Sequence, residues 1–174
     1  MIRAISGRIH SVFLLGMRTF SSHVGEVMLR KYRNEEEIYE LLRLFETGTI
    51  ARDKWKHAEH LVVALCYLRN DTLDGAYAKM RAGIFNLLRA FGVDLEKEMP
   101  YHETITVFWM RTAYAYMLMN EKASFVEMAN GLCELYDKDH PLKFYSRELL
   151  FSDRARSEFV EADLARHEQF ELRS

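Results

Sequence analysis

The stretch LVVALCYL, at positions 61–68, is apolar along its whole length. It is far shorter than the run of about 20 apolar residues that crosses a membrane. It forms the second half of a segment, residues 53–69, that contains neither glycine nor proline and has the composition of a helix. A helix that is apolar on every face is usually surrounded by other elements of its domain. We therefore expect residues 53–69 to form the central helix, with Asp53 as its N-cap.

Amphipathic helices are expected on both sides of this central helix. Asn34 precedes three glutamates and is a good N-cap for a helix that stops at Gly48. The remaining helical stretches are expected at residues 72–91, 101–119, 124–137, 142–151 and 152–164. No segment alternates with the period of a strand, and the connections are short. The sequence therefore predicts an all-α fold, a single bundle of about six helices with mainly antiparallel neighbours.

Composition divides the chain into three parts. Residues 1–33 form a basic extension, whose first 25 residues contain three arginines and no acidic residue. This composition is typical of an organellar transit peptide. A basic helix that lies on the domain, or upstream sequence before a start at Met28, would have the same composition. Residues 34–164 are expected to form the helical domain, and residues 165–174 a tail with little to bury.

Charge and cysteine content argue against some classes of protein and indicate a cellular compartment. A formal net charge of −2 over 174 residues leaves no broad basic surface for nucleic acid. No apolar run approaches the length of a membrane span. The two cysteines lie apart in apolar helical patterns, which suits a reducing compartment. We expect a cytoplasmic protein, or a mitochondrial or other organellar one if residues 1–25 are a transit peptide.

Two short polar signatures interrupt the apolar pattern. The first is WKHAEH at residues 55–60, and the second is YHET at residues 101–104. Each lies at the start of an expected helix. In an up-down bundle these two helices point the same way, with one helix running back between them, so their N-termini lie at the same end. The side chains that we expect to converge there are His57, His60, His102 and Glu103.

Three interpretations of this cluster remain open. As a metal site, its imidazoles and carboxylate are ligands for a divalent transition metal such as zinc, iron or nickel, and an open coordination position would make it catalytic. As a binding site, two helix N-termini favour a small anionic or polar molecule, and a neutral histidine there serves as a general base or a hydrogen-bonding partner. As a structural feature, the same residues only cap helices in a non-catalytic structural or interaction module.

Neighbouring residues would complete a binding site. Trp55 and Tyr101 offer flat walls, and Lys56 adds positive charge. Thr104 adds a hydroxyl group, and Arg147 would clamp an anion if the chain after Pro141 folds back. The leading hypothesis is a small-molecule site that uses histidines, with or without a metal and with or without catalysis.

The same motifs resemble a known family. The chain contains H-x-x-H-L at residues 57–61, YHETIT at residues 101–106 and YSR at residues 145–147. Together they resemble a family of small all-helical proteins, mostly bacterial, for which no activity is established. The resemblance covers roughly residues 40–164 and implies a shared site without implying a reaction. It departs at Ala162, where members of the family have a proline.

Overall fold

The computed structural model of the protein describes residues 31–98 and 100–164. Its elements are α1 (Glu35–Glu46), α2 (His57–Asn70), α3 (Leu73–Ala90), α4 (Glu103–Met119), α5 (Phe125–Leu135), the 3₁₀ helix η1 (His140–Lys143), α6 (Arg147–Leu150) and α7 (Asp153–Ser157). Over these ranges the chain contains helices and no strand, which confirms the predicted all-α class. Residues 1–30 of the expected basic extension (residues 1–33) and the expected tail at residues 165–174 lie outside the described residues.

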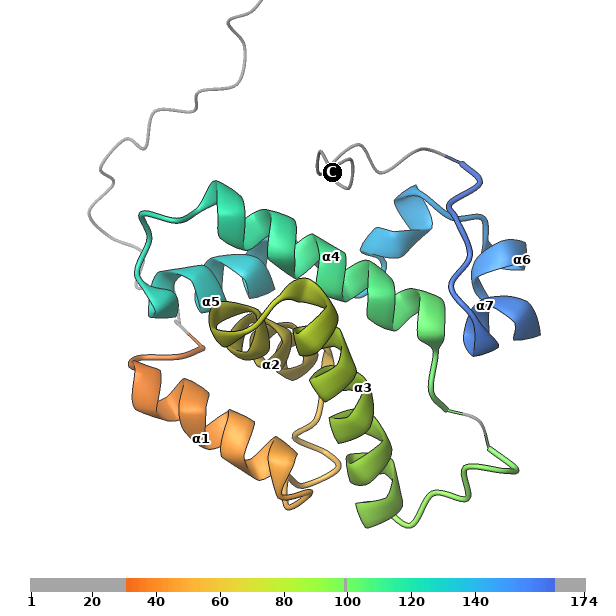
Figure 1. Ribbon diagram of the computed structural model, residues 1–174, viewed down its shortest axis with the longest axis horizontal. Coiled ribbons are helices and arrows are strands. Elements are labelled where there is room, and N and C mark those ends of the chain that lie inside the picture. The colour runs from red at the N-terminus through yellow and green to blue at the C-terminus, as the bar shows by residue number, and fades with distance from the viewer. Residues whose placement is uncertain (1–30, 99, 165–174) are drawn as a thin grey trace, which may run out of the picture.

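The helix α2 is the centre of the fold, as its sequence predicts. Every residue from Leu61 to Leu68 is buried, at 7% exposure or less. The helices α1, α3, α4 and α5 all contact α2 and surround it (Figure 1). This arrangement explains why no face of α2 carries a polar stripe in that stretch. Among the described helices, none is long and apolar enough to cross a bilayer.

Several helix boundaries follow the local signals in the sequence. The Asn34 side chain accepts a hydrogen bond from the Glu37 amide at 3.0 Å, and Ser124 with Glu127 forms a capping box at the start of α5. Gly48 and Gly92 follow α1 and α3 in the left-handed conformation, with φ of 67° and 73°. Such a conformation favours glycine, so both helices stop where the sequence predicts.

The start of the central helix differs from the prediction. Asp53 is exposed in a turn, and α2 begins four residues later, at His57. The Glu59 carboxylate accepts a hydrogen bond from the Lys56 amide at 2.9 Å and so satisfies an exposed amide at the helix start. The preceding turn is held against α1 because the rings of Trp55 and Phe45 stack, with centroids 4.8 Å apart.

The packed part of the chain includes residues just before Asn34. Tyr32 is buried, and its backbone exchanges two hydrogen bonds with the Asn130 side chain of α5, at 3.0 and 2.8 Å. The Lys31 ammonium lies 2.6 Å from the Glu59 carboxylate. These contacts attach the chain before α1 to both α2 and α5.

The C-terminal part is more broken than the two stretches predicted at residues 142–151 and 152–164. It consists of η1, α6 and α7, followed by chain without regular structure from Glu158 to Leu164. The hydroxyl groups of Ser146 and Ser152 each accept an amide hydrogen bond at the start of a new short helix. Each serine therefore begins a separate helix where the apolar pattern alone suggests longer ones.

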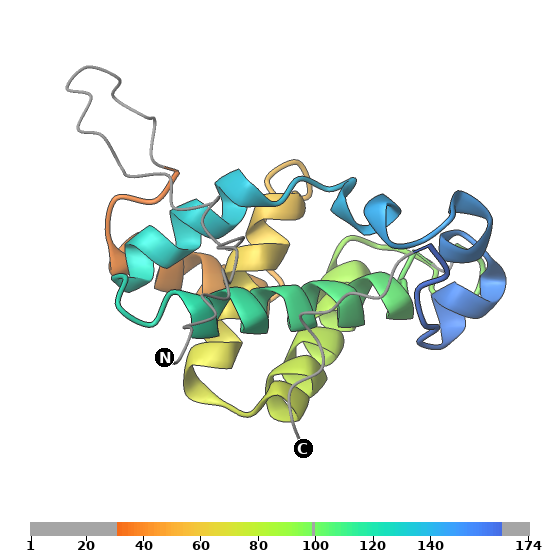
Figure 2. The same cartoon turned by 90° about the horizontal axis from the view of Figure 1, so that it is seen from above.

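The helix α2 runs across α4 rather than alongside it (Figure 2). The His57 ring, in the first turn of α2, lies against Trp109 in the middle of α4, with ring centroids 4.6 Å apart. The N-termini of α2 and α4 therefore do not meet side by side, contrary to the up-down arrangement expected from the sequence. A pocket lies between these two N-termini.

Candidate functional site

A partly open pocket of about 330 Å³ lies between α2, α3 and α4, and its lining is completed by Phe151, which directly follows α6, and by Arg156 of α7. Most of its lining is apolar or aromatic. The lining residues are His60, Ala64, Met80, Ile84, Pro100, Tyr101, His102, Ile105, Thr106, Trp109, Met110, Phe151 and Arg156. A concave, mainly apolar pocket with a few polar groups is the usual form of a small-molecule site.

One face of α4 forms the longest wall of this pocket. Its lining residues recur every three or four positions from His102 to Met110, so their side chains share one face of the helix. At a helical rise of about 1.5 Å per residue, this face is roughly 12 Å long. The pocket therefore has room for an elongated molecule.

His60 is the polar group of α2 that lines the pocket. Its ring lies against Trp55, with centroids 4.2 Å apart, and neither ring nitrogen forms a hydrogen bond with a residue that the structure describes. Burial lowers the pKa of His60 from 6.5 to about 4, and the nearby His57 acts in the same direction. At neutral pH the imidazole is uncharged and offers the pocket one donor and one acceptor.

His102 also lines the pocket, but both of its ring nitrogens are already used. Nδ1 accepts a hydrogen bond from the Ile105 amide at 3.3 Å, so the ring caps α4. Nε2 lies 2.7 Å from the Leu150 carbonyl oxygen, which can only accept, so Nε2 carries the proton. Burial lowers the pKa of His102, and the Arg156 charge lowers it further. The ring is a neutral link between α4 and α6.

His57 and Glu103 lie outside the pocket lining. The Nε2 of His57 donates to the Tyr136 carbonyl oxygen at 3.1 Å, and burial lowers its pKa. The Glu103 carboxylate accepts hydrogen bonds from the hydroxyl groups of Tyr77 and of Tyr101, the latter at 2.8 Å. The Arg81 guanidinium lies 3.5 Å from the same carboxylate. Glu103 therefore binds α4 to α3.

The predicted metal site is not supported by this geometry. Over residues 31–98 and 100–164, no group of three or more histidine, cysteine, aspartate or glutamate side chains could hold a metal ion. His102 has no free ring nitrogen, and Glu103 is bound by two tyrosines and an arginine. The four expected ligands, His57, His60, His102 and Glu103, occupy separate environments, and of the four only His60 and His102 share the pocket.

The other predicted binding residues have mixed outcomes. Tyr101 lines the pocket, and Trp55 packs behind the His60 ring. Lys56 is exposed at the start of α2 and does not line the pocket. Arg147 is exposed too, with its guanidinium over the Phe151 ring at 5.3 Å.

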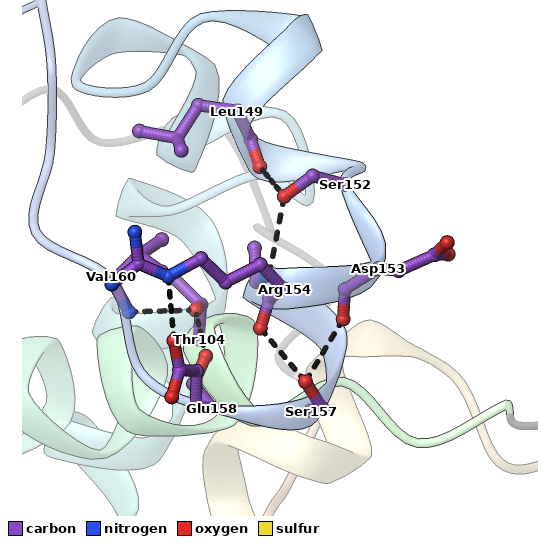
Figure 3. Close-up of polar contacts among 9 residues, drawn as sticks. Thr104, Leu149, Ser152, Asp153, Arg154, Ser157, Glu158 and Val160 are labelled. Atoms are coloured by element: carbon purple, nitrogen blue, oxygen red, sulfur yellow. Dashed lines mark hydrogen bonds and ion pairs between the residues drawn. The ribbon is translucent and has the colours of Figure 1, made fainter.

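Thr104 has a structural role instead of a binding role. It is completely buried, and its hydroxyl donates to the Glu158 carbonyl oxygen at 3.0 Å and accepts from the Val160 amide at 3.1 Å. Figure 3 shows this contact beside the bonds of the Ser152 and Ser157 hydroxyl groups that stabilise α7. One side chain of α4 thus fixes the chain that follows α7.

Replacing Thr104 with valine should lower the free energy of unfolding by about 1–3 kcal/mol, because the part-buried Glu158 carbonyl and the buried Val160 amide both lose their partner. Thr112→Val is the matched control. Thr112 is equally buried, but its hydroxyl bonds only to a carbonyl of its own helix, that of Phe108. Urea denaturation of both variants checks the prediction. Equal losses would mean that the hydroxyl of Thr104 does not stabilise the C-terminal wall.

Sequence reasoning missed three important residues of the pocket: Trp109, Met110 and Arg156. Trp109 and Met110 belong to a helix that is apolar almost all round, so no pattern separates pocket positions from core positions. Arg156 is about fifty positions from the α4 residues that it faces, and it reaches the pocket only because α7 folds back on α4. No local signal marks that contact.

Comparisons with family models, curated proteins and solved structures found no match to this chain. The family resemblance based on the motifs at residues 57–61, 101–106 and 145–147 therefore stays a prediction.

Proposed function

We propose that the protein binds a small, mainly apolar molecule in the pocket between α2, α3 and α4. The observation that carries this proposal is that the His60 ring lines the pocket without a hydrogen-bonding partner among the described residues. This imidazole is half-buried in the pocket lining, so a polar group of a ligand would satisfy it. A purely structural histidine would instead be bonded, as His57 and His102 are.

The size of the pocket limits the ligand. Its volume of about 330 Å³ is at the lower end of the range of about 300–1,000 Å³ that small-molecule sites have. A small ligand, such as a medium-chain alcohol or acid, suits this volume.

The chemistry of His60 favours binding over proton transfer. A general base works best when its pKa is near the operating pH. With a pKa of about 4, the neutral ring of His60 is a weak base at pH 7. It is well suited to donate or accept a hydrogen bond, and the Trp55 ring behind it restricts its orientation.

Saturable binding of 1-octanol is the expected result, because this probe has an apolar body of suitable size and one hydroxyl group for His60. Ala64→Leu should abolish the binding, since Ala64 is buried in the pocket wall and the larger side chain fills the volume. Titration followed by tryptophan fluorescence measures the affinity, because Trp109 lines the pocket.

The matched control is Ala78→Leu, which adds the same atoms at an exposed position of α3 outside the pocket. Circular dichroism verifies that both variants fold. Absence of saturable binding, or equal binding by the Ala64 and Ala78 variants, would reject the proposal in favour of a structural or interaction module.

A further inference from the structure

The polar side chains of the pocket fall into two groups. The hydroxyl groups of Tyr101 and Thr106 donate to Glu103 and to the His102 carbonyl, at 2.8 and 2.9 Å, and the His102 ring is bonded on both sides. Arg156 and His60 are different. Neither side chain forms a hydrogen bond or ion pair with any residue of the described ranges. Among the titratable side chains of the lining, these two are therefore the ones that remain available to a ligand.

Among the described residues, Arg156 is a cation without a paired carboxylate. Over residues 31–98 and 100–164, no carboxylate lies within ion-pairing distance of its guanidinium, and two acidic side chains of this region already have partners. Glu103 is bound by Arg81 and two tyrosines, and Glu158 lies against the exposed Arg154. Arg156 is half-buried on α7 and lines the pocket next to the N-terminus of α4. A half-buried guanidinium without a counter-charge favours an anion, which it can bind through two parallel hydrogen bonds.

The surroundings of Arg156 indicate what else the ligand carries. Phe151, 44% exposed, lines the pocket beside it, and Met80, Ile84 and Met110 supply a buried apolar interior. Arg156 is the only lysine or arginine among the lining residues. A single cation next to an apolar interior suits a ligand that has one negative charge and an apolar body. It suits a doubly charged phosphate less well.

We infer that the ligand is a small amphipathic monocarboxylate, with its acid group on Arg156 and its apolar body along α4. This inference rests on the proposed binding function and specifies the ligand class. His60, on α2, then hydrogen-bonds to a polar group of the ligand or to water that the ligand encloses.

Octanoate, 1-octanol and octylamine test the inference, because they share a chain length and differ in charge at neutral pH. Isothermal titration calorimetry on the full chain should give the highest affinity for octanoate and the lowest for octylamine. Arg156→Gln should weaken octanoate binding about tenfold to a hundredfold, the usual effect of losing a hydrogen bond to a charged group. It should change 1-octanol binding less than about twofold, and Arg156→Lys should restore part of the octanoate affinity.

Arg154→Gln is the matched control. It removes the same charge two residues away, from an exposed side chain that pairs with Glu158 and does not line the pocket. Its octanoate affinity should stay within about twofold of the original. If 1-octanol binds but octanoate binds no tighter, or if the Arg154 and Arg156 variants lose equal affinity, the anion assignment is overturned and the pocket remains. If no probe binds, the proposed function fails as well.

Discussion

Replacing Phe45 with alanine should lower the free energy of unfolding by about 3–5 kcal/mol, the usual loss for a large buried aromatic residue. Phe45 is completely buried, stacks on Trp55 and meets the edge of Tyr67 with ring centroids 6.4 Å apart. A Cβ added at Gly83 would come within 2.3 Å of the Phe45 ring, so α3 approaches this side chain closely. Little space is available for the neighbours to collapse into the cavity.

The same substitution should weaken ligand binding. Trp55 lies between Phe45 and His60, so loss of the ring behind it removes the support that orients the imidazole. Tyr39→Ala is a suitable control, because Tyr39 is an aromatic residue of the same helix that is 39% exposed. Urea denaturation should show a much smaller loss for that variant. A loss below about 1 kcal/mol for Phe45→Ala would contradict the packing described for this side chain.

Acidification should destabilise the protein through His60. The unfolded chain binds a proton on this ring with the ordinary pKa of 6.5, whereas the folded protein binds it only near pH 4. Between these values the unfolded state holds more protons, so stability falls as the pH falls from 6.5 to 4. The loss from this group is on the order of 3 kcal/mol. Burial lowers the pKa of His57, His102 and His140 as well, so these groups act in the same direction.

His60→Gln isolates this contribution, because glutamine does not titrate. Denaturation at pH 7 and at pH 4.5 should show a smaller loss of stability for the variant than for the unchanged protein. An NMR titration of the His60 ring provides the direct measurement, with the variant assigning the signal. A midpoint near 6.5 for that ring would mean that water in the pocket solvates the charged form freely.

The parts of the fold that depend only on residues close together in the sequence could be predicted. The apolar run at residues 61–68 indicates a central helix because burial on every face leaves no polar position. Asn34, Gly48, Gly92 and Ser124 define helix ends because a cap involves only the adjacent turn. The start of α2 is different. It depends on Trp55 packing on Phe45, a contact between two helices.

The site was harder to predict because it depends on how helices cross. The spacing of His57 and His60 places both on one side of α2, yet the crossing with α4 directs His57 to Trp109 and Tyr136 and His60 into the pocket. The residues of YHET also have two alternative uses. A histidine or threonine at a helix start either contacts a ligand or satisfies the backbone, and His102 and Thr104 form backbone hydrogen bonds in this fold. Such a choice depends on distant partners such as Leu150 and Val160.

The wall built by α6 and α7 also has a consequence for biosynthesis. A chain leaves the ribosome from its N-terminus, and α1 to α5 contain most of the buried apolar core. Phe151 and Arg156 are therefore synthesised after the residues of these helices. While the segment that contains them is not docked through Thr104 and His102, the central helix has its neighbours in the chain but the pocket lacks one wall. The core and the complete ligand site thus depend on different segments of the chain.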